Sequence, residues 1–156
     1  MAELAPGIEA PDFTLPRDGG GTVTLSAFRG RPVVLFFYPK DDTEGCTTEA
    51  KDFTAAKAGF DAAGVALLGI SPDPVGKHDR FIRKHDLGVA LASDEGLSTL
   101  EAYGVWKEKS MYGRTYMGVE RTTVLVGRDG KVARVWNKVK VPGHAAEVLE
   151  AVKALG

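Results

Sequence analysis

Two short apolar runs with a longer helical segment between them are the feature that most constrains how this chain can fold. The runs cover residues 33–38 and 65–71, and residues 43–60 between them place apolar side chains at helical spacing. Continuous apolar runs of this length are typical of strands buried on both faces of a sheet. A strand, a helix and a second strand in this order predict a parallel pair of strands with the helix packed across it.

Further elements extend this pattern in both directions along the chain. Asp129-Gly130 lies between two β-prone runs, residues 122–126 and 132–136, and this predicts an antiparallel hairpin. A weaker pattern of the same kind predicts a hairpin near the N-terminus, between residues 12–15 and 23–25. The remaining predictions are a helix over residues 74–85, a short strand near 89–92, a short helix near 97–103 and a final helix over 142–155.

The order of these elements predicts an α/β protein with a mixed central sheet that helices cover on both faces. It matches a thioredoxin-like fold with an N-terminal β-hairpin extension. A length of 156 residues fits one domain, so we expect residues 1–156 to form a single unit. A chain of this length buries enough apolar surface to fold without a disulfide or a structural metal.

The charge balance and the cysteine count exclude several classes of protein. With 20 basic and 21 acidic residues the formal net charge is −1, which argues against nucleic-acid binding. The single cysteine, Cys46, cannot form a disulfide within the chain, so we expect a reducing compartment, the cytoplasm. The N-terminus lacks the features of a signal peptide, and no apolar run is long enough to cross a membrane.

Cys46 has surroundings that favour a reactive thiol, although cysteine is often only a small buried side chain. Residues 41–43 are of the types that cap helices, so Cys46 falls in a first helical turn, where backbone N–H groups and the helix dipole stabilise a thiolate. Phe53, seven residues later, shares its helical face, a spacing that a structural cysteine would also show. Thr43 and Glu49, three residues to either side, add a hydroxyl and a carboxylate. Together these groups favour a site.

Residues 38–49, with the sequence YPKDDTEGCTTE, closely resemble the active-site loop of the peroxiredoxins. The signature of that family, Pro-x-x-x-Thr/Ser-x-x-Cys, is met here by Pro39, Thr43 and Cys46. This version of the loop is similar to that of the bacterioferritin comigratory protein (PrxQ) subfamily. The resemblance covers nearly the whole chain, since later segments also look like that subfamily in order and spacing: residues 69–73, 103–106 and 118–125.

The resemblance implies a thiol peroxidase in which the Cys46 thiolate is the peroxidatic nucleophile and becomes a sulfenic acid. Arg121 would stabilise the thiolate and the charge that develops on the O–O bond. Thr43 and the backbone N–H of Cys46 would hold the peroxide oxygens in line for displacement. Pro39 would shield the sulfur, and Glu49 would orient Arg121. The substrates implied are hydrogen peroxide and alkyl hydroperoxides.

The chain departs from many relatives because it has no second cysteine. Many relatives carry a resolving cysteine five residues after the peroxidatic one, where this chain has Lys51. Others carry it on a later helix, and the corresponding segments here, residues 78–83 and 98–101, contain no cysteine. A one-cysteine mechanism is therefore implied, in which an external thiol (thioredoxin, glutaredoxin or a low-molecular-weight thiol) reduces the sulfenic acid. The resemblance implies no metal, haem or flavin, and it favours a monomer.

Other activities of a reactive cysteine fit the sequence less well. A dithiol oxidoreductase needs Cys-x-x-Cys, but the residues three before and three after Cys46 are Thr43 and Glu49. A cysteine hydrolase needs a histidine base, and no local pattern provides one. The alternative that stays open is a redox-sensing or binding protein whose Cys46 signals by oxidation and does not need Arg121 and Thr43 together.

The histidines and several aromatic residues outside this loop are interpreted as structural. His78 and His85 lie seven residues apart on one predicted helix, too far apart for a standard two-ligand metal motif, and we interpret both as solvated. His144 is interpreted as a capping or surface residue of the final helix. Core packing is the default expectation for four aromatic residues, Trp106, Tyr112, Tyr116 and Trp136.

Overall fold

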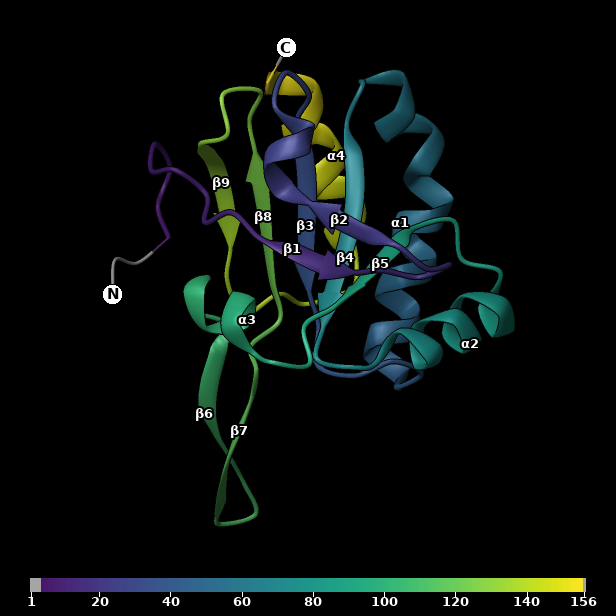
Figure 1. Ribbon diagram of the computed structural model, residues 1–156, viewed down its shortest axis with the longest axis vertical. Coiled ribbons are helices and arrows are strands. Elements are labelled where there is room, and N and C mark those ends of the chain that lie inside the picture. The colour runs from purple at the N-terminus through teal and green to yellow at the C-terminus, as the bar shows by residue number, and fades with distance from the viewer. Residues whose placement is uncertain (1–3, 156) are drawn as a thin grey trace.

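The two apolar runs form adjacent parallel strands at the centre of a mixed sheet, as predicted. The strands of this sheet are β3 (Val33–Phe37), β4 (Ala66–Ser71), β5 (Ala90–Ser93), β8 (Thr122–Val126) and β9 (Val132–Trp136). The computed structural model describes residues 4–155, and within them the sheet has the order β5-β4-β3-β8-β9 (Figure 1). β3, β4 and β5 are mutually parallel, whereas β8 runs antiparallel to both β3 and β9.

Helices cover both faces of the sheet, and the N-terminal segment crosses one of these faces, where it packs with a short helix (Figure 1). The helices are α1 (Glu44–Ala62), α2 (Val75–His85), α3 (Ser98–Ala102) and α4 (His144–Leu155). α1 and α4 pack against each other on one face, and α2 packs near β5 (Figure 1). β1 (Thr14–Pro16) and β2 (Thr22–Thr24) form the predicted N-terminal hairpin, which crosses the opposite face and leads into a short 3-10 helix, η1 (Leu25–Phe28).

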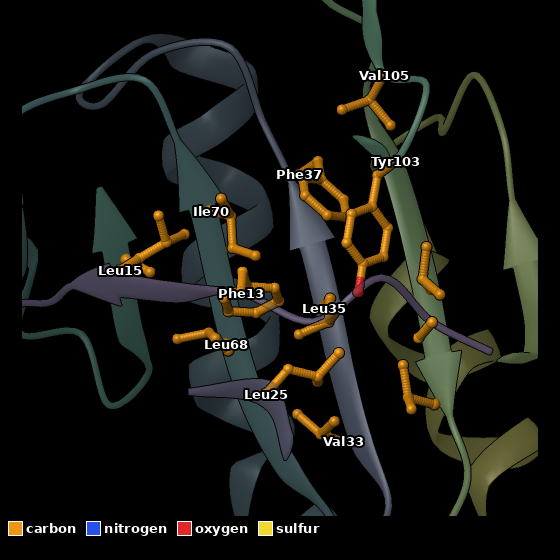
Figure 2. Close-up of a cluster of buried hydrophobic side chains, with 14 of the residues drawn as sticks. Phe13, Leu15, Leu25, Val33, Leu35, Phe37, Leu68, Ile70, Tyr103 and Val105 are labelled. Carbon is orange, nitrogen blue, oxygen red and sulfur yellow. The ribbon is translucent and has the colours of Figure 1, made fainter. Parts of the chain in front are cut away.

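Strand β3 is buried along its whole length because both of its faces are covered. Its alternate residues point to opposite sides of the sheet. Val33, Leu35 and Phe37 join the cluster beneath the N-terminal hairpin, which also contains Phe13 and Leu25 (Figure 2). Val34, Phe36 and Tyr38 join the second cluster, under α1 and α4. This second cluster also contains the side chain of Cys46.

The structure contains one hairpin that the sequence analysis did not predict. β6 (Trp106–Met111) and β7 (Arg114–Val119) pair with each other and project away from the body of the molecule (Figure 1). Tyr112 and Gly113 form its turn, both with positive φ, as a type I′ hairpin turn requires. Tyr112 is 97% exposed and Tyr116 44% exposed, so core packing was the wrong expectation for both. It is confirmed for Trp136, which is buried.

The other predicted elements are present with small shifts in their ends. The final helix begins at His144 rather than at Pro142, and the first long helix continues to Ala62. The mixed α/β sheet, its flanking helices and the hairpin of β8 and β9 are as predicted. Within residues 4–155, each helix is too short or too polar to span a lipid bilayer.

Candidate active site

Cys46 lies in the first turn of α1, directly after the loop that leaves the buried strand β3. Thr43 is the N-cap residue, with the extended backbone expected of that position, and Cys46 is the third helical residue. The first N–H groups of a helix have no partner within it, so they are free to interact with a thiolate or a bound oxygen. The Cys46 side chain is 2% exposed and packs with Ala50 and Phe53 on the side of α1 that faces the sheet. The side chain therefore points toward the sheet, on the helical face that it was expected to share with Phe53.

Arg121 contacts the sulfur although it lies 75 residues after Cys46 in the sequence. It lies between β7 and β8, and β8 pairs with β3 so that Thr122 is opposite Phe37, next to the loop that leads to α1. One guanidinium nitrogen, Nη2, donates to Cys46 Sγ at 3.3 Å. Burial of the guanidinium opposes its charge, but the nearby Glu49 and Cys46 outweigh this and raise the Arg121 pKa. Arg121 therefore stays a cation beside the sulfur.

Glu49 completes a triad with Cys46 and Arg121, of which Arg121 alone is partly exposed. Its Oε1 accepts a hydrogen bond of 2.8 Å from Arg121 Nη1, so the two ends of one guanidinium hold the carboxyl and the sulfur. The Glu49 side chain is 2% exposed, and its Oε2 has no hydrogen-bond partner in the structure. Burial raises the pKa of Glu49 to about 7, a rise that the charge of Arg121 reduces but does not cancel.

Thr43 and Pro39 lie in the same loop but outside this set of contacts. The Thr43 hydroxyl donates to the backbone oxygen of Lys40 at 2.8 Å and makes no hydrogen bond to the helix N-terminus, so the expected side-chain cap is absent. Because the hydroxyl proton is used in this way, its lone pairs stay free to accept. Thr43 is exposed and Pro39 is half-buried. The roles that we expected for these two residues remain predictions.

Because Gly45 has no side chain, the Arg121 guanidinium can lie close to the backbone at this position. A Cβ atom at this position would lie 3.1 Å from Arg121 Nη2, the nitrogen that contacts the sulfur. We expect Gly45→Ala to slow the reaction of Cys46 with peroxide by about 3–10-fold, since small displacements of a catalytic group are costly. Stability to urea should be unchanged or slightly higher because alanine favours helix. The measurements are the rate of peroxide consumption and urea unfolding of the reduced protein.

Gly76→Ala is the matched control for this prediction. Gly76 is the second residue of α2, as Gly45 is of α1, and a Cβ there meets only Arg80 at an ordinary 3.8 Å. We expect no change in the peroxide rate from this variant. Equal rates in the two variants would mean that the position of Arg121 Nη2 does not limit the reaction.

The sequence interpretation of two histidines was wrong. His78 is fully buried and His144 is 5% exposed, whereas His78 was expected to be solvated and His144 to cap the final helix or lie at the surface. His144 Nε2 hydrogen-bonds Thr123 Oγ1 at 2.7 Å, inside the cluster between the sheet and α4. Burial lowers the pKa of His144 and favours its neutral form. Helical period alone does not reveal such burial, because the polar partners of both rings come from distant strands and loops.

His78, Asp41 and Asp73 form a buried polar cluster whose atoms lie close enough to hold a metal ion. The ring nitrogens of His78 are already bound, Nδ1 to Asp41 Oδ2 at 2.6 Å and Nε2 to the backbone oxygen of Ala92 at 3.0 Å. Lys77 places its ammonium 3.2 Å from Asp73 Oδ1. A metal ligand must offer a free lone pair. The cluster is therefore an internal network of hydrogen bonds and ion pairs.

Known proteins share both the sequence and the fold of this chain. A family model described as the AhpC/TSA family matches residues 6–135. Peroxiredoxin Bcp of Xanthomonas campestris is 47% identical over 156 residues, covering 99% of this chain and 98% of the relative. Peroxiredoxin Bcp of Bacillus subtilis is 45% identical over 147 residues, covering 94% of each chain.

Solved structures agree with these sequence matches. Xanthomonas campestris peroxiredoxin Q has a TM-score of 0.90 and 45% identity, covering 96% of this chain and 97% of that one. A structure of the bacterioferritin comigratory protein of the same organism, described in connection with its alkyl peroxide reduction activity, has a TM-score of 0.90 and 44% identity. It covers 96% of this chain and 98% of that one.

Proposed function

Because this chain belongs to the AhpC/TSA family and is a peroxiredoxin with a thioredoxin-like fold, we propose that Cys46 reduces hydrogen peroxide and alkyl hydroperoxides. The observation that carries this proposal is the contact between Arg121 Nη2 and Cys46 Sγ, 3.3 Å, at the start of α1. A cation and a helix N-terminus both stabilise a thiolate, which is the nucleophilic form of cysteine.

The reaction follows from the chemistry of this thiolate. The sulfur attacks one peroxide oxygen, the O–O bond breaks, and the second oxygen leaves as hydroxide or alkoxide and takes up a proton. The products are Cys46 sulfenic acid and water or an alcohol, and the sulfur is oxidised by two electrons. Arg121 and the N–H groups at the helix start stabilise the charge that moves onto the departing oxygen. The free lone pairs of Thr43 accept a hydrogen bond from the peroxide, and Pro39 shields the sulfur from water.

Regeneration must use a thiol from outside the chain, since Cys46 is its single cysteine. One thiol condenses with the sulfenic acid to give a mixed disulfide and water, and a second thiol releases Cys46 and leaves as the disulfide. Thioredoxin, glutaredoxin and low-molecular-weight thiols all have this chemistry. Cys46 is only 2% exposed, so we propose that the first turn of α1 opens locally to admit the reductant. We also propose that the chain acts as a monomeric, single-domain protein of the cytoplasm.

A single-turnover experiment tests the peroxidase. The reduced protein is mixed with one equivalent of hydrogen peroxide in the absence of thiols, and peroxide loss and intact mass are followed together. We expect consumption far faster than by free cysteine, ending with one oxygen atom added per chain, and no such reaction in Cys46→Ser. Cumene hydroperoxide in place of hydrogen peroxide tests the alkyl substrates.

Reaction no faster than that of free cysteine would contradict the peroxidase and favour the sensing or binding alternative. Adding reduced thioredoxin, glutaredoxin and a low-molecular-weight thiol in turn, with excess peroxide, then identifies the reductant. The physiological reductant should support repeated turnover. Failure of all three, after a fast single turnover, would contradict only the proposed regeneration.

A further inference from the structure

The loop between β3 and α1, residues 38–43, is held by α2 at two consecutive aspartates. On the inner side, Asp41 Oδ2 lies 2.6 Å from His78 Nδ1, and both side chains are completely buried. On the outer side, Asp42 accepts from Lys84 Nζ at 2.7 Å and from His85 Nε2 at 2.8 Å. The three basic groups all belong to α2, and Cys46 lies only four residues beyond Asp42.

The inner pair is fully hydrogen-bonded. Both ring nitrogens of His78 have an oxygen partner: Nε2 meets the Ala92 carbonyl oxygen, and Nδ1 shares a proton with Asp41 Oδ2. Asp41 Oδ1 accepts from the Tyr38 hydroxyl at 2.5 Å. The backbone N–H of Asp41 donates to Asp73 Oδ2 at 2.8 Å. Side chain and backbone of Asp41 are thus both fixed.

The contacts on the outer side hold Asp42, a residue whose backbone is strained. Asp42 has a φ of 63°, in the left-handed region that non-glycine residues seldom adopt. Such conformations persist only where the surroundings over-determine them, and they concentrate at functional sites. The hydrogen bonds from His85 and Lys84 oppose relaxation of Asp42 and hold the pKa of its carboxyl below the usual range. Directly after Asp42 the chain reaches Thr43, the N-cap of α1.

We propose that His78 and His85 are positioning residues for the peroxidatic cysteine. Through Asp41 and Asp42 they hold the loop in the conformation that keeps Cys46 buried against Arg121. This inference rests on the proposed function, because it concerns the state of Cys46 that reacts with peroxide. Release of either aspartate should let the first turn of α1 open more often. Cys46 then becomes more accessible to reagents, while its reaction with peroxide slows.

Asp42→Asn, with Asp61→Asn as its control, tests the contacts that Asp42 makes with Lys84 and His85. Asparagine tolerates the left-handed backbone, so Asp42→Asn removes the charge without adding strain. Asp61 forms an exposed pair with Lys57 at 2.8 Å on α1, far along the helix from Cys46. We expect alkylation of reduced Cys46 by iodoacetamide to be about 2–5-fold faster in Asp42→Asn, the effect of weakening the contacts of Asp42 with Lys84 and His85 at the surface, and unchanged in Asp61→Asn. Peroxide consumption should be slower in Asp42→Asn alone.

His78→Gln with Leu100→Ala as its control tests the inner pair. Leu100 is fully buried in the cluster on the other face of the sheet, so its truncation destabilises the protein away from Cys46. We expect His78→Gln to slow peroxide consumption by about tenfold or more, as loss of alignment does, and to speed alkylation. Leu100→Ala, compared at a temperature below both unfolding transitions, should change neither rate. A merely structural role of His78 would affect the two variants alike.

The outcomes are separable. Equal alkylation and peroxide rates in Asp42→Asn and Asp61→Asn, together with equal rates in His78→Gln and Leu100→Ala, would overturn the positioning role. If His78→Gln does not fold, the comparison of Asp42→Asn with Asp61→Asn decides whether the loop positions Cys46. Alkylation requires no peroxide chemistry. A wild-type protein that reacts slowly with peroxide would therefore contradict the proposed function, while the alkylation rates would still report on the loop.

Discussion

Replacing Arg121 by methionine should lower the second-order rate constant for reaction of Cys46 with hydrogen peroxide by about 10²–10³-fold, the usual cost of removing one donor aimed at developing charge. Methionine fills much of the same volume but cannot donate to Cys46 Sγ, a contact of 3.3 Å, or to Glu49 Oε1. The thiolate loses its nearest cation, and the departing peroxide oxygen loses its donor. The measurement is stopped-flow peroxide consumption by the reduced variant under single-turnover conditions.

Two further variants make this result specific. Arg121→Lys keeps the charge but loses the planar fork that holds sulfur and carboxyl together, so we expect a rate between those of methionine and wild type. Arg29→Met removes an exposed arginine whose guanidinium lies 3.9 Å from Glu9, and it should leave the rate unchanged. If Arg121→Met with its fold intact reacts at the wild-type rate, Arg121 has no role in the chemistry and the sensing alternative gains support.

The stability difference between wild type and Glu49→Gln should decrease by about 3 kcal/mol as the pH rises from about 4.5 to about 7. Burial raises the pKa of Glu49 from 4.5 to about 7 in the folded protein, against the opposing effect of Arg121. Between these values the folded chain binds a proton that the unfolded chain has lost. Glu49 therefore contributes its full stabilisation below the pKa that it has in the unfolded chain. This contribution is lost as the pH rises through the higher pKa that it has in the folded protein. Glutamine has no such proton.

Urea unfolding of reduced wild type and Glu49→Gln across this pH range measures the difference. Subtracting the two curves removes the titration of the groups that both proteins share. Glu120→Gln, at a carboxyl that pairs with Lys107 near the surface, is the control for loss of an acidic side chain outside the triad. A wild-type advantage that grows with pH would show that Arg121 keeps Glu49 ionised, contrary to the burial of Oε2 without a partner.

The central fold was predictable because its signals are local. The apolar run of β3, the helical spacing of α1 and Asp129-Gly130 between β8 and β9 each lie within a few neighbouring residues. The β6–β7 hairpin was missed because most of its side chains are exposed and do not alternate between apolar and polar. Its signal was the turn at Tyr112-Gly113, which only a search for left-handed backbone positions would have found.

The candidate site was predictable only in part. Its helix-start position follows from the residues around Cys46, but Arg121 is 75 residues away and entered through the family resemblance alone. The link from His78 to Asp41 spans 37 residues and had no comparable guide. The spacing of apolar residues identifies the apolar face of a helix. In the sequence, however, a buried histidine among charged helix residues cannot be distinguished from a solvated one. Only the packing of α2 against the active-site loop distinguishes the two.

The lone sulfur of Cys46 also determines how a population of these molecules responds to its surroundings. In the proposed cycle each oxidised chain waits for an encounter with a thiol, because it has no second sulfur of its own. The lifetime of the oxidised form is then inversely proportional to the concentration of the reductant, and its rate of formation is proportional to that of peroxide. At steady state the oxidised fraction therefore depends on the ratio of peroxide to thiol rather than on the concentration of either.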